Sequence, residues 1–206
     1  MPLIIKSGAS TARATVGSTS KALYVNPVDS RGVDRGKKAS YAACTAAATA
    51  IGSTSVKQFS VLSASLTKTI RLQRVRVSGT CATAAIYADV KLVKLSTNPS
   101  SGTKTDLIQV PLVSSSAAGS AVLAAIYTAE PTEGTVVGTL ASATMFAPIT
   151  GTPATGTSIV DFNFAVGGEL ETPVLVAAGT QAFALKIGTA YSNALTLNVE
   201  WYWTEE

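Results

Sequence analysis

Apolar and polar residues alternate along the C-terminal end of the chain. From residue 195 the apolar residues occupy every odd position: Leu195, Leu197, Val199, Trp201 and Trp203. A repeat of two residues is typical of a β-strand with one buried face. Both tryptophans of the 206-residue protein lie on this apolar side. Because a buried aromatic side chain removes about 150–250 Å² from water, we expect this strand to be essential to the core, and its truncation to unfold the domain.

Short strand-like segments follow one another through most of the preceding sequence. The predicted strands cover residues 57–63, 69–77, 85–95, 107–113, 121–128, 135–140, 158–166, 174–177, 181–187 and 194–203. Turn-forming residues separate them, including Ser78, Gly79 and Thr80. This pattern predicts an all-β fold, an antiparallel β-sandwich or jelly roll. The alanine-rich residues 41–51 leave a short helix open, although their threonines disfavour it.

The predicted strand over residues 69–77 contains a break in its alternation. Apolar residues stand at even positions as far as Leu72 and at odd positions from Val75 onward. A regular strand cannot keep both sets on one face, so we predict a β-bulge near Gln73 and Arg74. Three arginines are then expected to form a ladder on the polar face, where they contact an acidic partner or simply keep the sheet soluble: Arg71, Arg74 and Arg76.

The positive charge of the protein is concentrated in its first 38 residues. This segment has seven basic and two acidic residues (7 − 2 = +5), whereas the other 168 residues have nine and ten (9 − 10 = −1). We therefore predict an extended basic N-terminal arm over residues 1–38, weakly structured between residues 7 and 20, and a β-sandwich over residues 39–206. An arm of this kind suits an acidic protein surface or nucleic acid, or it is a solvated tail. Its candidate partner-binding residues are Arg13, Lys21, Arg31, Arg35, Lys37 and Lys38.

The sequence offers little material for catalysis. It has no histidine, which excludes Ser-His-Asp and Cys-His arrangements and imidazole metal ligands. Three close carboxylate pairs are interpreted as solvated groups of turns and chain ends: Glu130 with Glu133, Glu169 with Glu171, and Glu205 with Glu206. The two cysteines, Cys44 and Cys81, are interpreted as small core residues with free thiols. We predict a protein that is not an enzyme and uses no cofactor or metal.

Neither a membrane span nor a secretion signal is predicted. Apolar residues are mostly alanine mixed with Ser, Thr and Gly, and no run approaches the 18–20 residues or so that a spanning helix needs. The first residues lack the basic and hydrophobic regions of a signal peptide. We expect a protein assembled in a host cytoplasm.

Several segments together resemble a group of virion proteins of tailed bacteriophages. They are LTKTIRLQRVRVSGT (66–80), YADVKLVKLS (87–96), YTAEPTEGTVVG (127–138) and EWYWTEE (200–206). The resemblance covers about residues 55–206 and consists of strands and turns, so it implies a virion component but no catalytic residues.

The resemblance and the residue patterns together lead us to expect a capsid decoration or cement protein. Such a protein would bind the major capsid protein or other virion proteins, form a dimer or trimer, and bind neither nucleic acid nor membrane. An alternative is a receptor- or glycan-binding module of a tail fibre, spike or head fibre, with Tyr87, Tyr127 and Tyr191 stacking on sugars. A neck or tail adaptor is a further alternative, and a hydrolase that uses carboxylates is the least favoured.

Overall fold

The computed structural model describes residues 4–7, 10–16, 23–25, 39–51, 58–112, 123–151, 158–165, 172–177, 179–188 and 194–206. The chain divides into two compact units, Met1–Lys38 and Ala39–Glu206. The first unit contains β1 (Ile4–Ser7), β2 (Ser10–Val16) and β3 (Leu23–Val25), which form an antiparallel sheet in the order β1-β2-β3. Strand β2 thus covers much of the segment that was expected to be weakly structured.

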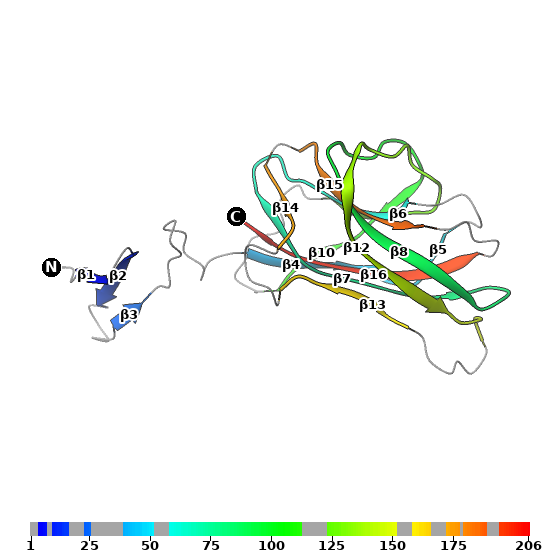
Figure 1. Ribbon diagram of the computed structural model, residues 1–206, viewed down its shortest axis with the longest axis horizontal. Helices are drawn as coiled ribbons and strands as arrows, with labels where there is room; N and C mark the ends of the chain where they lie inside the picture. Colours follow the sequence, from blue (N-terminus) through cyan, green and yellow to red (C-terminus); the bar gives the residue numbers. More distant parts are fainter. Residues whose placement is uncertain are drawn as a thin grey trace. The chain divides into compact units, whose positions relative to one another are not determined.

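The second unit consists of two antiparallel sheets (Figure 1). Sheet I has the order β10 (Gln109–Pro111), β4 (Ala39–Cys44), β16 (Leu195–Glu205), β7 (Ile70–Cys81) and β13 (Val160–Asn163), with β5 (Thr49–Ile51) beside β16 and β14 (Val174–Leu175) beside β7. Sheet II has the order β12 (Val136–Ala147), β8 (Ile86–Leu95), β15 (Ala182–Ile187), β6 (Gln58–Ser63), β11 (Ala124–Tyr127) and β9 (Lys104–Asp106). The prediction of an all-β, two-sheet protein is therefore confirmed. The described residues include no helix that could cross a membrane.

Eight strands pair as the two arms of one long hairpin folded on itself. Strand β4 pairs with β16, β6 with β15, β7 with β13, and β8 with β12. Successive pairs alternate between sheet I and sheet II. Each sheet therefore joins strands from distant parts of the sequence, and these pairs require both arms of the hairpin.

Strand β16 lies between β4 and β7 in sheet I, and its buried side chains contribute to the core between the sheets. Its odd residues are buried, and both tryptophans are at most 1% exposed, as the alternation predicted. The Trp201 indole donates a hydrogen bond of 2.9 Å to the Ser60 hydroxyl of sheet II. Tyr41 stacks on Trp203 with 5.8 Å between the ring centroids. The hydrogen bond to Ser60 therefore links β16 to sheet II, and the stacking on Tyr41 links it to β4 within sheet I.

The structure corrects the local predictions in several places and closes the alternative of a short helix. The turn predicted at Gly79 is part of β7, where a Cβ would lie 2.5 Å from the Thr196 carbonyl oxygen, so glycine is needed for close approach and not for a turn. Residues 41–51 form no helix but contribute to β4 and β5, paired with β16. Strand β12 continues to Ala147, and β9 was not predicted, because pairing with a neighbouring strand compensates for weak local patterns.

The outer face of sheet II is partly covered. Val93, Ala184, Val61 and Ala125 stand opposite one another across four strands, on the face away from the core, and are at most 3% exposed. The connection over residues 128–135 lies above them: Glu133 forms a 2.5 Å ion pair with Lys186 of β15. Glu130 accepts a hydrogen bond from the backbone of Gln58 in β6, and Pro131 is buried. Sheet II therefore has apolar contacts on both faces.

Candidate functional site

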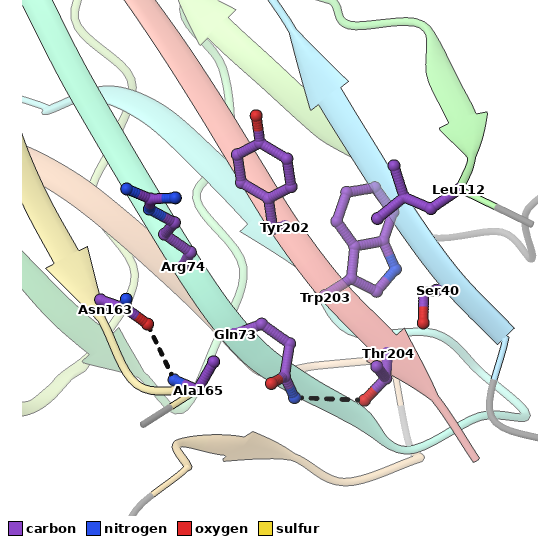
Figure 2. Close-up of a pocket in the computed structure, with 9 residues that line it drawn as sticks. All are labelled: Ser40, Gln73, Arg74, Leu112, Asn163, Ala165, Tyr202, Trp203 and Thr204. Atoms are coloured by element: carbon purple, nitrogen blue, oxygen red, sulfur yellow. Dashed lines mark hydrogen bonds between the residues drawn. The ribbon is translucent and has the colours of Figure 1, made fainter. Parts of the chain in front are cut away.

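A shallow hollow of about 390 Å³ lies on the outer face of sheet I (Figure 2). We call it the sheet I groove. It crosses the sheet from the end of β10 through β4, β16 and β7 to β13. It is lined by Ser40, Gln73, Arg74, Leu112, Asn163, Ala165, Tyr202, Trp203 and Thr204.

The predicted β-bulge builds this groove. Tyr202 is paired with Arg74, but the next residue of β16, Trp203, is paired with Leu72, so Gln73 is the extra residue. A bulge places two successive side chains near the same face of a strand, and both Gln73 and Arg74 line the groove. The buried residues before and after the bulge, Leu72 and Val75, both remain in the core. The prediction of a bulge at this place is confirmed.

The groove contains several polar groups with hydrogen-bonding capacity to spare. The Gln73 amide donates to the Thr204 hydroxyl at 3.4 Å, which leaves its carbonyl oxygen. The Asn163 carbonyl oxygen accepts from the backbone N–H of Ala165 at 3.0 Å, which leaves its amide hydrogens. Within the described part of the chain, the Ser40 hydroxyl and the Nη1 of Arg74 make no hydrogen bond. A ligand in the groove would therefore meet both donors and acceptors.

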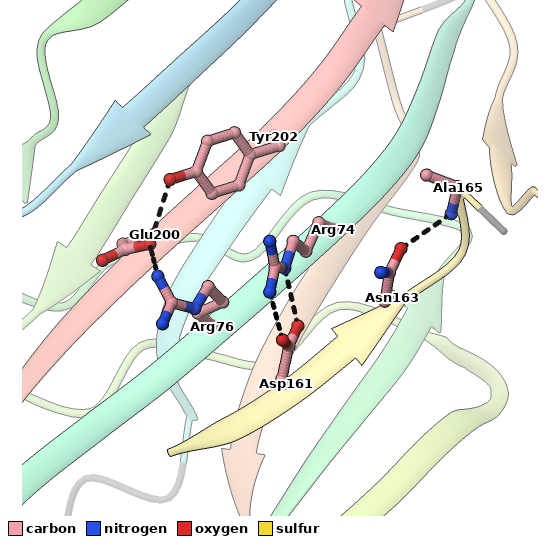
Figure 3. Close-up of polar contacts among 7 residues, drawn as sticks. All are labelled: Arg74, Arg76, Asp161, Asn163, Ala165, Glu200 and Tyr202. Atoms are coloured by element: carbon pink, nitrogen blue, oxygen red, sulfur yellow. Dashed lines mark hydrogen bonds and ion pairs between the residues drawn. The ribbon is translucent and has the colours of Figure 1, made fainter.

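Ion pairs hold the floor of the groove in place (Figure 3). Arg74 binds Asp161 through two nitrogens, with Nε 2.8 Å from Oδ1 and Nη2 against Oδ2. These hydrogen bonds raise the pKa of Arg74 and lower the pKa of Asp161. Arg76 and the Tyr202 hydroxyl both donate to the Glu200 carboxylate, at 3.1 Å and 3.0 Å. Burial, followed by the hydrogen bond to Glu200, raises the pKa of Tyr202.

The three arginines of the predicted ladder each have a carboxylate partner within the protein. Arg71 pairs with Glu206 at 2.5 Å. The other two arginines form the pairs described above, with Asp161 and Glu200. Three cations therefore meet three anions on this face, and the sum of these charges is zero. An acidic partner would have to compete with existing ion pairs, which weakens the case for electrostatic attraction here. A role of these arginines in partner binding stays a prediction.

The candidate residues of the N-terminal unit have no described side chains. Arg13 lies in β2, for which the backbone alone is described. The other candidates lie outside the described residues: Lys21, Arg31, Arg35, Lys37 and Lys38.

An apolar stripe borders the groove at the edge of sheet I. Ile108, Val110 and Leu112 are 77%, 51% and 55% exposed. Val110 lies in the edge strand β10 and the other two flank that strand, so the alternation places all three on one face. The Leu112 backbone N–H donates to the Ser40 carbonyl oxygen of β4. The backbone nitrogen of the preceding residue, Pro111, therefore points away from β4, where its missing N–H costs no hydrogen bond of the sheet. Pro111 also reduces the capacity of the edge to pair with another strand. The stripe is suited to packing against another protein through its side chains.

Several smaller expectations are corrected by the positions of single residues. Cys81 is buried but Cys44 is exposed, because Cys44 ends β4 on the outer face of sheet I. Tyr87 is exposed and packs on Phe146 with 5.2 Å between centroids, whereas Tyr127 is buried and cannot stack on a sugar. Tyr191 lies outside the described residues.

The carboxylate pairs are used for structure where they are described. Glu205 is buried and accepts a hydrogen bond from the Trp203 indole at 3.2 Å, so the expectation that it is solvated was wrong. Glu206 pairs with Arg71, and Glu133 with Lys186. Glu169 and Glu171 lie outside the described residues.

The sequence drew attention to only part of the groove. Arg74 and the bulge at Gln73 were identified, but Leu112, Asn163 and Ala165 were not. The one local signal for a further member was Tyr202, an aromatic residue on the polar side of β16.

No cluster of three or more Cys, Asp or Glu side chains within the described ranges is placed to hold a metal ion. Comparisons of the chain with family models, with curated proteins and with solved structures gave no match.

Proposed function

We propose that this protein is a non-enzymatic structural component of a tailed-phage virion that decorates the capsid and stabilises the head. In this proposal a jelly roll is the body of the protein, and the basic N-terminal unit is an attachment arm on the major capsid protein. The jelly roll is supported by the pairing of the eight strands as one folded hairpin. The resemblance of residues 55–206 to virion proteins supports the location.

The uneven charge of the two units is the observation that carries the attachment mechanism. Met1–Lys38 is a unit of its own and has a charge of +5 (7 − 2), while the remaining residues have −1 (9 − 10). A positive segment joined to a nearly neutral body is attracted to acidic surfaces without changing the solubility of the body. Binding through a tethered segment adds attachment without a larger core.

The apolar stripe on β10 supports the same mechanism as a second surface. Its three residues are exposed on a protein that buries large apolar side chains elsewhere on the sheet. Contact with a neighbouring subunit, or with a second copy in a dimer or trimer, would remove this area from water.

The first experiment measures the copy number and the position of the protein on purified particles. Quantitative mass spectrometry of particles, with imaging, should find hundreds of copies over the head. A few to a few tens of copies at one vertex or on the tail would instead favour an adaptor or a receptor-binding module. Absence from particles would overturn the proposal.

Charge removal tests the attachment mechanism directly. Purified protein is added to capsids that lack it, and the bound fraction is measured. Replacing Arg31, Arg35 and Lys37 with Gln should lower this fraction at least about tenfold at low salt, because complementary charge drives docking. The matched control replaces three lysines of the sandwich with Gln: Lys68, Lys91 and Lys104. Equal loss of binding in both variants would contradict attachment through the N-terminal unit.

A further inference from the structure

We propose that the sheet I groove is a binding site for a neutral, linear oligosaccharide. This inference does not depend on attachment to a capsid, because it rests on the groove alone. It would add a carbohydrate-binding function to a protein whose proposed role is structural.

The form of the groove suits an extended ligand. It crosses five strands, and four strand spacings of about 4.8 Å span roughly 19 Å. Its volume of about 390 Å³ lies within the usual range of small-molecule sites. The ligand would thus lie across the strands and contact side chains from each of them.

The charge of the groove points to a neutral ligand. Among the described residues of its lining, Arg74 is the one cationic group, and it is bound to Asp161 by two hydrogen bonds. An anionic ligand would meet the Asp161 carboxylate together with the guanidinium. A cationic ligand would meet Arg74, and the described lining residues include no carboxylate to bind it. Neither charge is favoured, whereas hydroxyl groups can use the remaining Nη1 hydrogens of Arg74.

The remaining groups match the surface of a sugar. A saccharide has hydroxyl groups that both donate and accept, and patches of C–H groups that pack on aromatic rings. The groove offers the Asn163 amide hydrogens, the Gln73 carbonyl oxygen and the Ser40 hydroxyl for the first. It offers the Tyr202 ring and the Leu112 side chain for the second, as Figure 2 shows.

A peptide fits this site less well than a sugar. Extended peptides bind sheets mainly by adding a strand to an edge, where backbone hydrogen bonds supply the affinity. The groove lies on the face of sheet I, where the backbone groups of β16 and β7 are already paired with one another. Side chains must therefore supply all polar contacts, which a ligand rich in hydroxyl groups can satisfy.

The test is a titration of the full-length, ¹⁵N-labelled protein, followed by nuclear magnetic resonance. The probes are linear tetrasaccharides of glucose, mannose and N-acetylglucosamine, each up to about 10 mM, a concentration that detects binding with a Kd of about 1 mM. At least one probe should shift the side-chain amide signals of Asn163 and Gln73 and the backbone signals of residues 202–204. No shift with any probe, or shifts confined to another region, would overturn the proposal.

Two variants and a matched control locate the binding. Asn163→Ala and Tyr202→Ala should each weaken binding of the same tetrasaccharide at least about tenfold, because they remove a hydrogen-bond donor and the stacking ring. The control is Asn198→Ala, in a second hollow of about 340 Å³ on the same strand β16, which should change Kd less than about twofold. Thermal unfolding shows whether each variant is folded, and the titration of the unmodified protein tests the proposal even if Tyr202→Ala does not fold. Equal loss in the control, or tighter binding of an uncharged Ser/Thr-rich peptide than of any sugar, would contradict the assignment.

Discussion

The outer faces of the two sheets are used in different ways. On sheet II a row of four apolar residues lies beneath the connection over residues 128–135 and is almost fully buried. On sheet I the corresponding face carries paired charges, the groove and the exposed apolar stripe of β10. Sheet II thus stabilises the protein through both of its faces, whereas sheet I uses one face for the core and keeps the other for contacts.

Burial patterns along the strands reflect this difference. In sheet II, β6 and β11 are buried at every position, because the core lies on one side and the connection on the other. In sheet I, β16 alternates between buried and partly exposed residues along its whole length. A strand that is buried on both faces is therefore a sign of a covered sheet, and an alternating strand leaves a face available for binding.

The same substitution on the two outer faces should have very different effects. Val61→Asp in sheet II places a carboxylate in an apolar, covered site and should lower the free energy of unfolding by about 4 kcal/mol or more. Val110→Asp on the exposed stripe of sheet I should change it by less than about 0.5 kcal/mol. Urea unfolding, followed by tryptophan fluorescence, measures both values. Similar losses in the two variants would show that the faces do not differ as described.

Deletion of a regular residue of β7 should have the next largest effect. Deletion of Arg71 breaks the alternation before the bulge, so either Ile70 or Leu72 must turn away from the core. We expect a loss of about 3 kcal/mol of unfolding free energy, also measured in urea. Deletion of the extra residue Gln73 is the matched control and should cost far less, because the shortened strand alternates strictly and keeps Leu72 and Val75 in the core. Equal losses in the two deletions would contradict the assignment of Gln73 as the extra residue.

The ion pair of the groove should have the smallest effect, and one that depends on pH. Because Arg74 lowers the pKa of Asp161, the pair stabilises the protein above the unfolded-state pKa of about 3.9, and this contribution is lost as pH falls through the lower folded-state pKa. Asp161→Asn should therefore lower Tm by about 1–2 °C at pH 7, because the pair is partly exposed.

Calorimetry at several pH values tests this expectation. The difference in Tm between the variant and the unmodified protein should shrink as the solution is acidified below pH 4 or so, and also in about 1 M salt. A difference that grows at low pH would show that Asp161 does not act as a carboxylate partner of Arg74.

Much of the fold follows from the sequence itself. Side chains alternate strictly along a strand, so the buried face of β16 and the bulge in β7 could be read from apolar residues alone. The absence of histidine is likewise a property of the sequence, and it excludes the chemistry that requires an imidazole.

The tertiary structure decided what lies opposite each strand. Residues far apart in the sequence meet in the groove, such as Gln73 and Thr204, and local patterns contain no information on such pairs. For the same reason Gly79 was taken for a turn residue, although it permits close contact with β16. Glu205 was expected in solvent because it lies beside the chain end, but it pairs with β7 and its carboxylate accepts a hydrogen bond from the Trp203 indole. The identity of a strand depends on its own residues, whereas its neighbours depend on how the whole chain packs.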